Sequence, residues 1–172
     1  MSYLKKLLKT IDSVSEASGW VAKWFALVLV FAGTYEAVAR HFFDAPTEWA
    51  YDVLCMAGGA LYMLGASYDY LKDAHTRVDM FYNMLPPRGR AFMNVICSLF
   101  LFFPLMVVML KLAVTWAIRA VKINEVFFNS FWYPPAWPYR TVFAVGLFLL
   151  VLQAGANLVR DFYFMVRGET LD

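Results

Sequence analysis

The sequence predicts an all-α integral membrane protein with four transmembrane helices and an N-terminal amphipathic helix at the membrane interface. Of its 172 residues, 62% are hydrophobic and 16% are charged, whereas soluble domains usually contain about 25% charged residues. The hydrophobic residues occur in long blocks, and the mean hydropathy is +0.56, which is typical of membrane-spanning segments. We expect a single domain over residues 1–172.

The four spans are expected at about residues 20–40, 49–71, 91–114 and 141–160. Ala91–Leu110 is the clearest block, because twenty residues without a charge make about 30 Å of helix, enough to cross the hydrocarbon core. Thr141–Val159 is also uncharged. The first block is uncharged only over Trp24–Tyr35, so we expect Lys23 to extend to one membrane surface and Glu36 to lie near the other.

The basic residues predict that both termini lie in the cytoplasm. Ten of the fifteen Lys and Arg residues fall in the two terminal segments and in the connection between the second and third spans. Short cytoplasmic segments carry an excess of Lys and Arg, so this side is predicted to face the cytoplasm.

Residues 1–18 have the pattern of an amphipathic helix that lies on the cytoplasmic surface. Its apolar residues follow helical spacing, opposite lysines and acids: Leu4, Leu7, Leu8, Ile11 and Val14. A helix with one apolar face and one lysine-rich face binds in the plane of the membrane interface. We therefore expect this segment to lie on the membrane and not to cross it.

A polar turn between the second and third spans places His75, Arg77 and Asp79 at alternate positions. A bis-histidine haem site needs two histidines at matched depth, but His41, the other of the two histidines, is predicted on the opposite side of the membrane. A zinc site would lack further ligands. The residues alone favour a solvated, self-paired charged turn, and no cofactor is expected.

Charged residues near the outer ends of the first two spans are predicted to tie these spans together. Glu36 and Arg40 have the i, i+4 spacing at which opposite charges pair on a helix. Glu48 and Asp52 lie across a short loop, so Arg40 is expected to face three carboxylates. The alternative is an ion-coupling acid, because acids within the membrane are functional candidates by default. Their position near helix ends, where water reaches them, favours the structural role.

Small and amide residues in the spans predict contacts between helices. Gly58, Gly65 and Ala66 are expected to share a face of the second span that another backbone can approach closely. The sequence leaves open whether that helix belongs to this chain or to a partner. Gln153 and Asn157, also spaced i and i+4, are expected to face protein and not lipid.

The remaining polar and aromatic features have simple interpretations. Val121–Tyr139 is rich in aromatic residues and proline, which predicts an aromatic belt at the outer surface or, alternatively, an interaction site. Lys111, late in the third span, is expected to extend to the outer surface and to need no partner. Cys55 and Cys97 are expected near opposite faces of the membrane, too far apart for a disulfide.

No pattern in the sequence supports an enzyme. A nucleotide-binding loop, a nucleophile beside a base and a zinc-protease motif are all absent, and no basic stripe indicates nucleic-acid binding. Neither an inverted repeat nor Gly/Pro-interrupted helices indicate a transport site. The residues alone predict a four-helix membrane subunit that needs a partner.

Three motifs in this order add a more specific prediction. They are EAVARHFF with Arg40, EWAYDVL with Trp49 and Asp52, and HTRVDMFY with His75, Arg77 and Asp79. In motif order and in its four-span layout, the chain resembles the small permease subunit (DctQ-like) of TRAP (tripartite ATP-independent periplasmic) transporters. It departs from that family at Asp52, where glutamate is usual, and at His41, where an aromatic residue is usual.

The resemblance implies an accessory membrane subunit of a sodium-gradient-driven importer of organic acids in the bacterial inner membrane. The implied partners are a large permease subunit, whose scaffold this chain would brace, a periplasmic solute-binding protein and membrane lipids. No substrate or ion site is implied here, and the turn with His75 becomes a cytoplasmic clasp.

Two functions from other classes are the alternatives. The first is a membrane anchor of a respiratory oxidoreductase, which would hold quinone or haem. The second is a stand-alone homodimeric exporter with Glu36 as its coupling acid.

Overall fold

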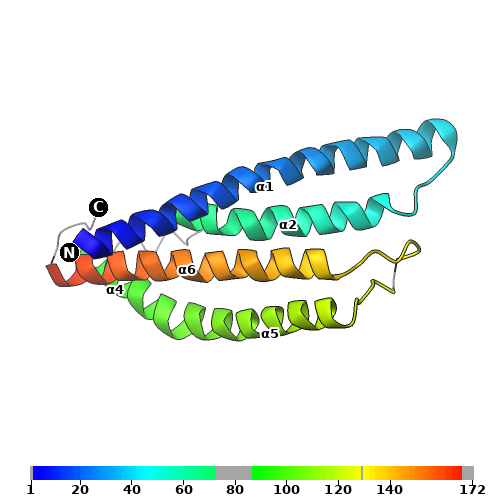
Figure 1. Cartoon of the computed structure of the whole chain (residues 1–172). Helices are drawn as coiled ribbons and strands as arrows, with labels where there is room; N and C mark the ends of the chain where they lie inside the picture. Colours follow the sequence, from blue (N-terminus) through cyan, green and yellow to red (C-terminus); the bar gives the residue numbers. More distant parts are fainter. Residues whose placement is uncertain (1, 73–86, 129, 168–172) are drawn as a thin grey trace.

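The computed structural model describes residues 2–72, 87–128 and 130–167, and its regular structure there is helical (Figure 1). The elements are α1 (Ser2–Phe43), α2 (Ala50–Leu71), α4 (Pro87–Cys97), the π-helix η1 (Ser98–Phe102), α5 (Phe103–Lys122) and α6 (Trp137–Arg167). No β-strand forms within these ranges, although an isolated bridge joins Val126 and Pro135. The predicted all-α class is confirmed.

The long helices follow one another in the order α1, α2, α6 and α5, as a layer (Figure 1). Near the end that holds the termini, α1 also packs on α6, and Tyr70 of α2 packs on Phe102. Each packs mainly on its neighbours in that row, and α4 packs on α6. The layer carries many exposed apolar side chains, such as Phe31, Phe100 and Leu105. Apolar surface of this extent indicates contact with lipid or with a partner.

The layer has two ends, which we name by what they hold. At the terminal end, α1 begins and α6 ends, and at the loop end lie the α1–α2 and α5–α6 connections (Figure 1). The expectation that both termini lie on one side of a membrane stays a prediction. The arrangement of the helices does not determine which side of a membrane the terminal end faces.

Small residues build the core of the layer, where α2, α5 and α6 meet. They are Ala66, Ala113, Ala117 and Ala144, with Leu147 and Leu150. Short side chains let helix backbones approach closely without a space to fill. The approach is closest at Gly146, where an added Cβ would lie 2.8 Å from the carbonyl carbon and oxygen of Met63.

Among the described residues, three helices are long and apolar enough to cross a membrane: Tyr3–Phe43, Phe92–Lys122 and Trp137–Val166. The expected second span, α2, is not one of them, because it contains Asp52, Asp69 and several glycines and tyrosines. Its 22 residues still make about 33 Å of helix. The count of four spans therefore stays a prediction.

α1 is one continuous helix, so the described part of residues 1–18 does not form a helix separate from the first span. Leu8 is 3% exposed and packs on Ala156 of α6, so protein covers part of the apolar face that was expected to rest on lipid. The apolar pattern defines a face but not what covers it. Gly19 does not interrupt α1, and its missing side chain makes room for the Tyr68 ring of α2.

The third expected span is bent at η1, which joins α4 to α5. Pro104 follows η1 and has no N–H group to donate, and π-helical turns and proline are both recognised causes of helix kinks. The bend turns α4 toward the end of α6 (Figure 1), where the Asn94 amide donates a hydrogen bond to Asp161 at 3.1 Å.

Candidate functional site

At the loop end, Glu36 joins α1 to the connection that leads into α2. Arg40 donates to Glu36 Oε1 from Nη2 at 2.5 Å and from Nε at 3.1 Å. The backbone N–H of Thr47 donates to Oε2 at 3.1 Å, and the Thr47 hydroxyl donates to the same oxygen. Both carboxylate oxygens of Glu36 are thus used to fix the path of the chain.

Asp52 contacts the α5–α6 loop and not Arg40. Its Oδ2 accepts a hydrogen bond from the Trp132 indole at 2.9 Å and another from the Ser130 hydroxyl. The expected group of three carboxylates around Arg40 is therefore not formed, and Glu48 is exposed. Spacing within α1 and α2 could not reveal this, because the partners of Asp52 lie 78 and 80 residues further along the chain.

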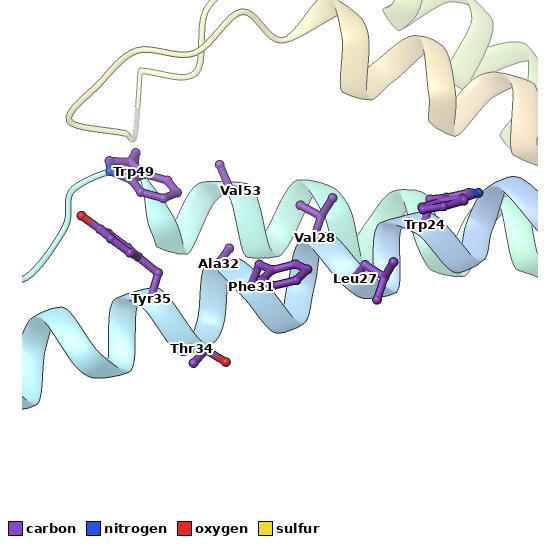
Figure 2. Close-up of a pocket in the computed structure, with 9 residues that line it drawn as sticks. All are labelled: Trp24, Leu27, Val28, Phe31, Ala32, Thr34, Tyr35, Trp49 and Val53. Carbon is purple, nitrogen blue, oxygen red and sulfur yellow. The ribbon is translucent and has the colours of Figure 1, made fainter.

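Trp49 precedes α2 and stacks on Tyr35 of α1, with ring centroids 5.6 Å apart and planes 30° apart. From this contact back toward Trp24, α1 and α2 line an open apolar groove of about 850 Å³. Figure 2 shows the residues that line it: Trp24, Leu27, Val28, Phe31, Ala32, Thr34, Tyr35, Trp49 and Val53. Acyl chains or apolar side chains of a partner fit such a lining.

The α5–α6 loop is held in one shape by its own bonds. Arg140 binds both oxygens of Glu125, at 2.5 and 2.8 Å, and the backbone N–H of Ala136 donates to the Glu125 carbonyl at 2.8 Å. Phe128 and Phe131 are exposed at the tip. The charges of this ion pair thus neutralise each other while aromatic rings face outward, an arrangement that suits both a membrane belt and an interaction surface.

We expect Asp52→Ala to release this loop from α2, because two hydrogen bonds to a carboxylate are lost. Such bonds contribute about 1.5–3 kcal/mol each. Faster hydrogen–deuterium exchange over residues 125–136 would show the release. Glu48→Ala removes a nearby exposed acid and should leave exchange unchanged. Equal exchange in the two variants would show that Asp52 does not hold the loop.

At the terminal end, a buried polar network joins α1 to α6. The fully buried Gln153 accepts a hydrogen bond from the Ser15 hydroxyl at 2.7 Å and donates to Asp12 at 3.0 Å. Arg160 donates to both oxygens of Asp12, at 2.5 and 3.2 Å. Ser15 and Asp12 come from the segment that was expected to lie on the membrane surface, so this network was not foreseen.

The same network continues to α2. Asn157 donates to the backbone carbonyl of Tyr70 at 3.1 Å, and the Ser18 and Ser67 hydroxyls lie 2.8 Å apart. Gln153 and Asn157 therefore both contact protein. The signal that sequence reasoning missed is the set of serines, since small hydroxyl residues in apolar helices commonly bond across to a neighbouring helix.

An exposed ion pair lies beside this network. Lys72, just after α2, donates to Glu16 of α1 at 3.1 Å. This hydrogen bond, together with the charge of Glu16, raises the pKa of Lys72. Both side chains are about half exposed, so the pair adds little to stability.

The small residues of α2 have different surroundings within this chain, and the approach of a partner helix to them stays a prediction. Ala66 is buried in the core of the layer, but an added Cβ at Gly65 would meet nothing within 4 Å, and one at Gly58 would only touch Leu29 at 3.9 Å. The tight position is Gly59, where a Cβ would lie 2.6 Å from the Tyr139 hydroxyl. Gly65 lies on an open part of the surface.

His75, Arg77 and Asp79 lie outside the described residues, so the cytoplasmic clasp stays a prediction. In the part of the chain that the structure describes, no group of three or more His, Cys, Asp or Glu residues could hold a metal ion. Cys55 and Cys97 are both free and exposed. The polar contacts described here therefore join helices and loops to one another.

Long apolar helices that are joined by polar contacts at both ends define an integral membrane subunit. Residues 29–163, most of the chain, match the family described as "Tripartite ATP-independent periplasmic transporters, DctQ component". The chain belongs to this family, and the resemblance indicated by its motifs is confirmed. The family is a transporter component and not an enzyme family, and it works with a large permease and a solute-binding protein. Among curated proteins, none matches the chain.

Proposed function

We propose that this chain is the accessory small subunit of a sodium-gradient-driven TRAP importer of organic acids in the bacterial inner membrane. It braces the scaffold of the large permease and binds no solute itself. The observation that carries this proposal is the family match over residues 29–163. In this proposal α2 also crosses the membrane, which brings the number of spans to four, and both termini lie in the cytoplasm.

The exposed apolar surface supports a bracing role. The outer helices α1 and α5 leave many large apolar side chains exposed, which a partner helix can cover. The most apolar stretch of Phe92–Lys122 has no buried residue at all. Hydrogen-bonded ion pairs at the two ends, around Asp12 and around Glu36, hold the helices in place. A rigid subunit of this kind suits a bracing role.

The position of α2 supports its role as a span. It lies between α1 and α6 (Figure 1), and both of these helices are long and apolar enough to cross a membrane. Two of its polar side chains, Asp52 and Ser67, have hydrogen-bond partners within the chain. Partners in α1 and in the α5–α6 loop therefore lower the cost of placing this less apolar helix in lipid.

Purification of the tagged chain from its native membrane in mild detergent tests the proposal. We expect a large multi-span permease at equal stoichiometry, identified by mass spectrometry, and a colourless sample. A haem absorption band or a flavoprotein partner would instead identify a respiratory anchor. A homodimer without other proteins would identify a stand-alone exporter. Uptake of labelled organic acids by the reconstituted complex, with and without a sodium gradient, tests substrate class and coupling.

A further inference from the structure

Lys111 lies on the exposed surface of α5, among apolar side chains that are themselves exposed: Val107, Val108, Leu112 and Val114. Within the described ranges, no hydrogen bond or ion pair satisfies its ammonium group. The buried residues of α5, Ala113, Ala117 and Ala120, mark the side that faces α6. Lys111 therefore points away from the other helices of this chain.

The packing of α5 on α6 gives the depth of Lys111. One groove is lined from α5 by Leu110, Val114, Ala117 and Ile118, and from α6 by Thr141, Ala144, Val145 and Phe148. The two helices run in opposite directions (Figure 1), so Ile118 is level with Thr141, and Leu110 is level with Phe148. Lys111 therefore lies at the depth of Phe148, within the uncharged run Thr141–Val159 that is expected to cross the hydrocarbon core.

The nearer membrane surface for Lys111 is at the loop end. Arg119 marks that end on α5 and lies eight residues away, about 12 Å along the helix. A lysine side chain spans about half of that distance. The Cα–Cβ bond in a helix also tilts toward the helix N-terminus, which for α5 is the terminal end. Extension to the loop end would therefore run against the direction in which the side chain leaves the helix.

The opposite edge of the layer offers a contrast. On α1, Glu36 and Arg40 pair with each other. Lys23 is exposed and lies one turn from Gly19, at the level of Tyr68 near the end of α2. Its Cα–Cβ bond tilts toward the N-terminus of α1, which is the nearer end, so Lys23 reaches the membrane surface in the favoured direction. Among the described residues of the two edge helices, α1 and α5, Lys111 is the charge that faces outward without such a route.

We propose that Lys111 marks the face of the layer that packs against the large permease, where its ammonium donates to a carboxylate or to carbonyl oxygens of a permease helix. Lysines at this depth are costly in lipid and are found paired with acidic groups or backbone carbonyls. Val108 and Thr115 flank Lys111 on the same face at helical spacing. The Thr115 hydroxyl donates to the Lys111 carbonyl at 2.8 Å, so Thr115 brings no unsatisfied donor to this face. The inference rests on the proposed function.

Site-specific photocrosslinking in native membranes tests which edge meets the permease. A photoreactive residue at Val108 or Thr115 is expected to form an adduct with the permease, whereas one at Phe31, which is 72% exposed on α1, is not. An adduct from Phe31 alone would place the permease on the other edge and overturn the inference. Adducts only with lipid, or only with a second copy of this chain, would overturn it as well. Failure of the unmodified chain to co-purify with any permease would instead refute the proposed function.

Substitution of the lysine gives a second, independent test. Lys111→Met keeps the length of the side chain and removes the charge, so a permease acceptor would lose its donor. We expect the amount of co-purified permease to fall about tenfold or more. Lys111→Arg should restore it. Lys122→Met, at the end of the same helix, is the matched control and should retain the permease fully. Undiminished retention by Lys111→Met would contradict the pairing.

Discussion

Gly146→Leu is expected to force α6 away from α2 and to destabilise the helix layer. A Cβ at this position would lie 2.8 Å from two backbone atoms of Met63 and 2.9 Å from its Cβ. Backbone atoms cannot move aside by a change of rotamer, so the two helices must separate along their contact. Overpacking of a well-packed core costs about 1–3 kcal/mol, and leucine adds much more than the first carbon.

Thermal unfolding of the isolated chain in detergent measures this effect. We expect the midpoint to fall by several degrees or more for Gly146→Leu. Gly65→Leu is the matched control, because an added Cβ at Gly65 meets nothing within 4 Å, and its midpoint should stay close to that of the unmodified chain. Equal midpoints for the two variants would mean that the α2–α6 contact at Gly146 is not tight in the folded protein.

Much of the fold could be predicted from local composition, because helix formation and membrane crossing both depend on neighbours in sequence. The helices at 91–114 and 141–160 contain long uncharged runs, and both form, although each extends beyond its expected bounds. The order of helices in the layer could not be predicted in this way. Small residues show that a face can be approached but not by which helix, and of the three expected in α2 only Ala66 is in the buried core.

The partners of the charged residues were the least predictable part of the site. Glu36 and Arg40 contact each other, as their spacing within one helix suggests. Asp12 and Asp52 both bind residues far along the chain, so their partners depend on tertiary packing. The environment of Gln153 was more predictable, because an amide group in lipid needs hydrogen-bond partners from protein. Gln153 has such partners in Ser15 and Asp12.

Arg160→Ala is expected to loosen the first turns of α1 from α6. Arg160 donates to both oxygens of Asp12, which without it would keep, among the described residues, the hydrogen bond from Gln153. The side chains of the pair are 25% and 26% exposed, so the effect is smaller than for a fully buried pair. We expect a loss of about 1–3 kcal/mol. Faster hydrogen–deuterium exchange over residues 8–20 would locate this loss on α1.

A double-mutant cycle separates the pair from its surroundings. If Asp12 and Arg160 stabilise the chain mainly through each other, Asp12→Ala combined with Arg160→Ala will destabilise it by less than the sum of the single changes. Glu16→Ala is the comparison, because it breaks the exposed pair with Lys72 and should have little effect. Strict additivity, or an equal effect of Glu16→Ala, would mean that α1 is held to α6 by the packing of Leu8 and the buried Gln153 and not by this charge pair.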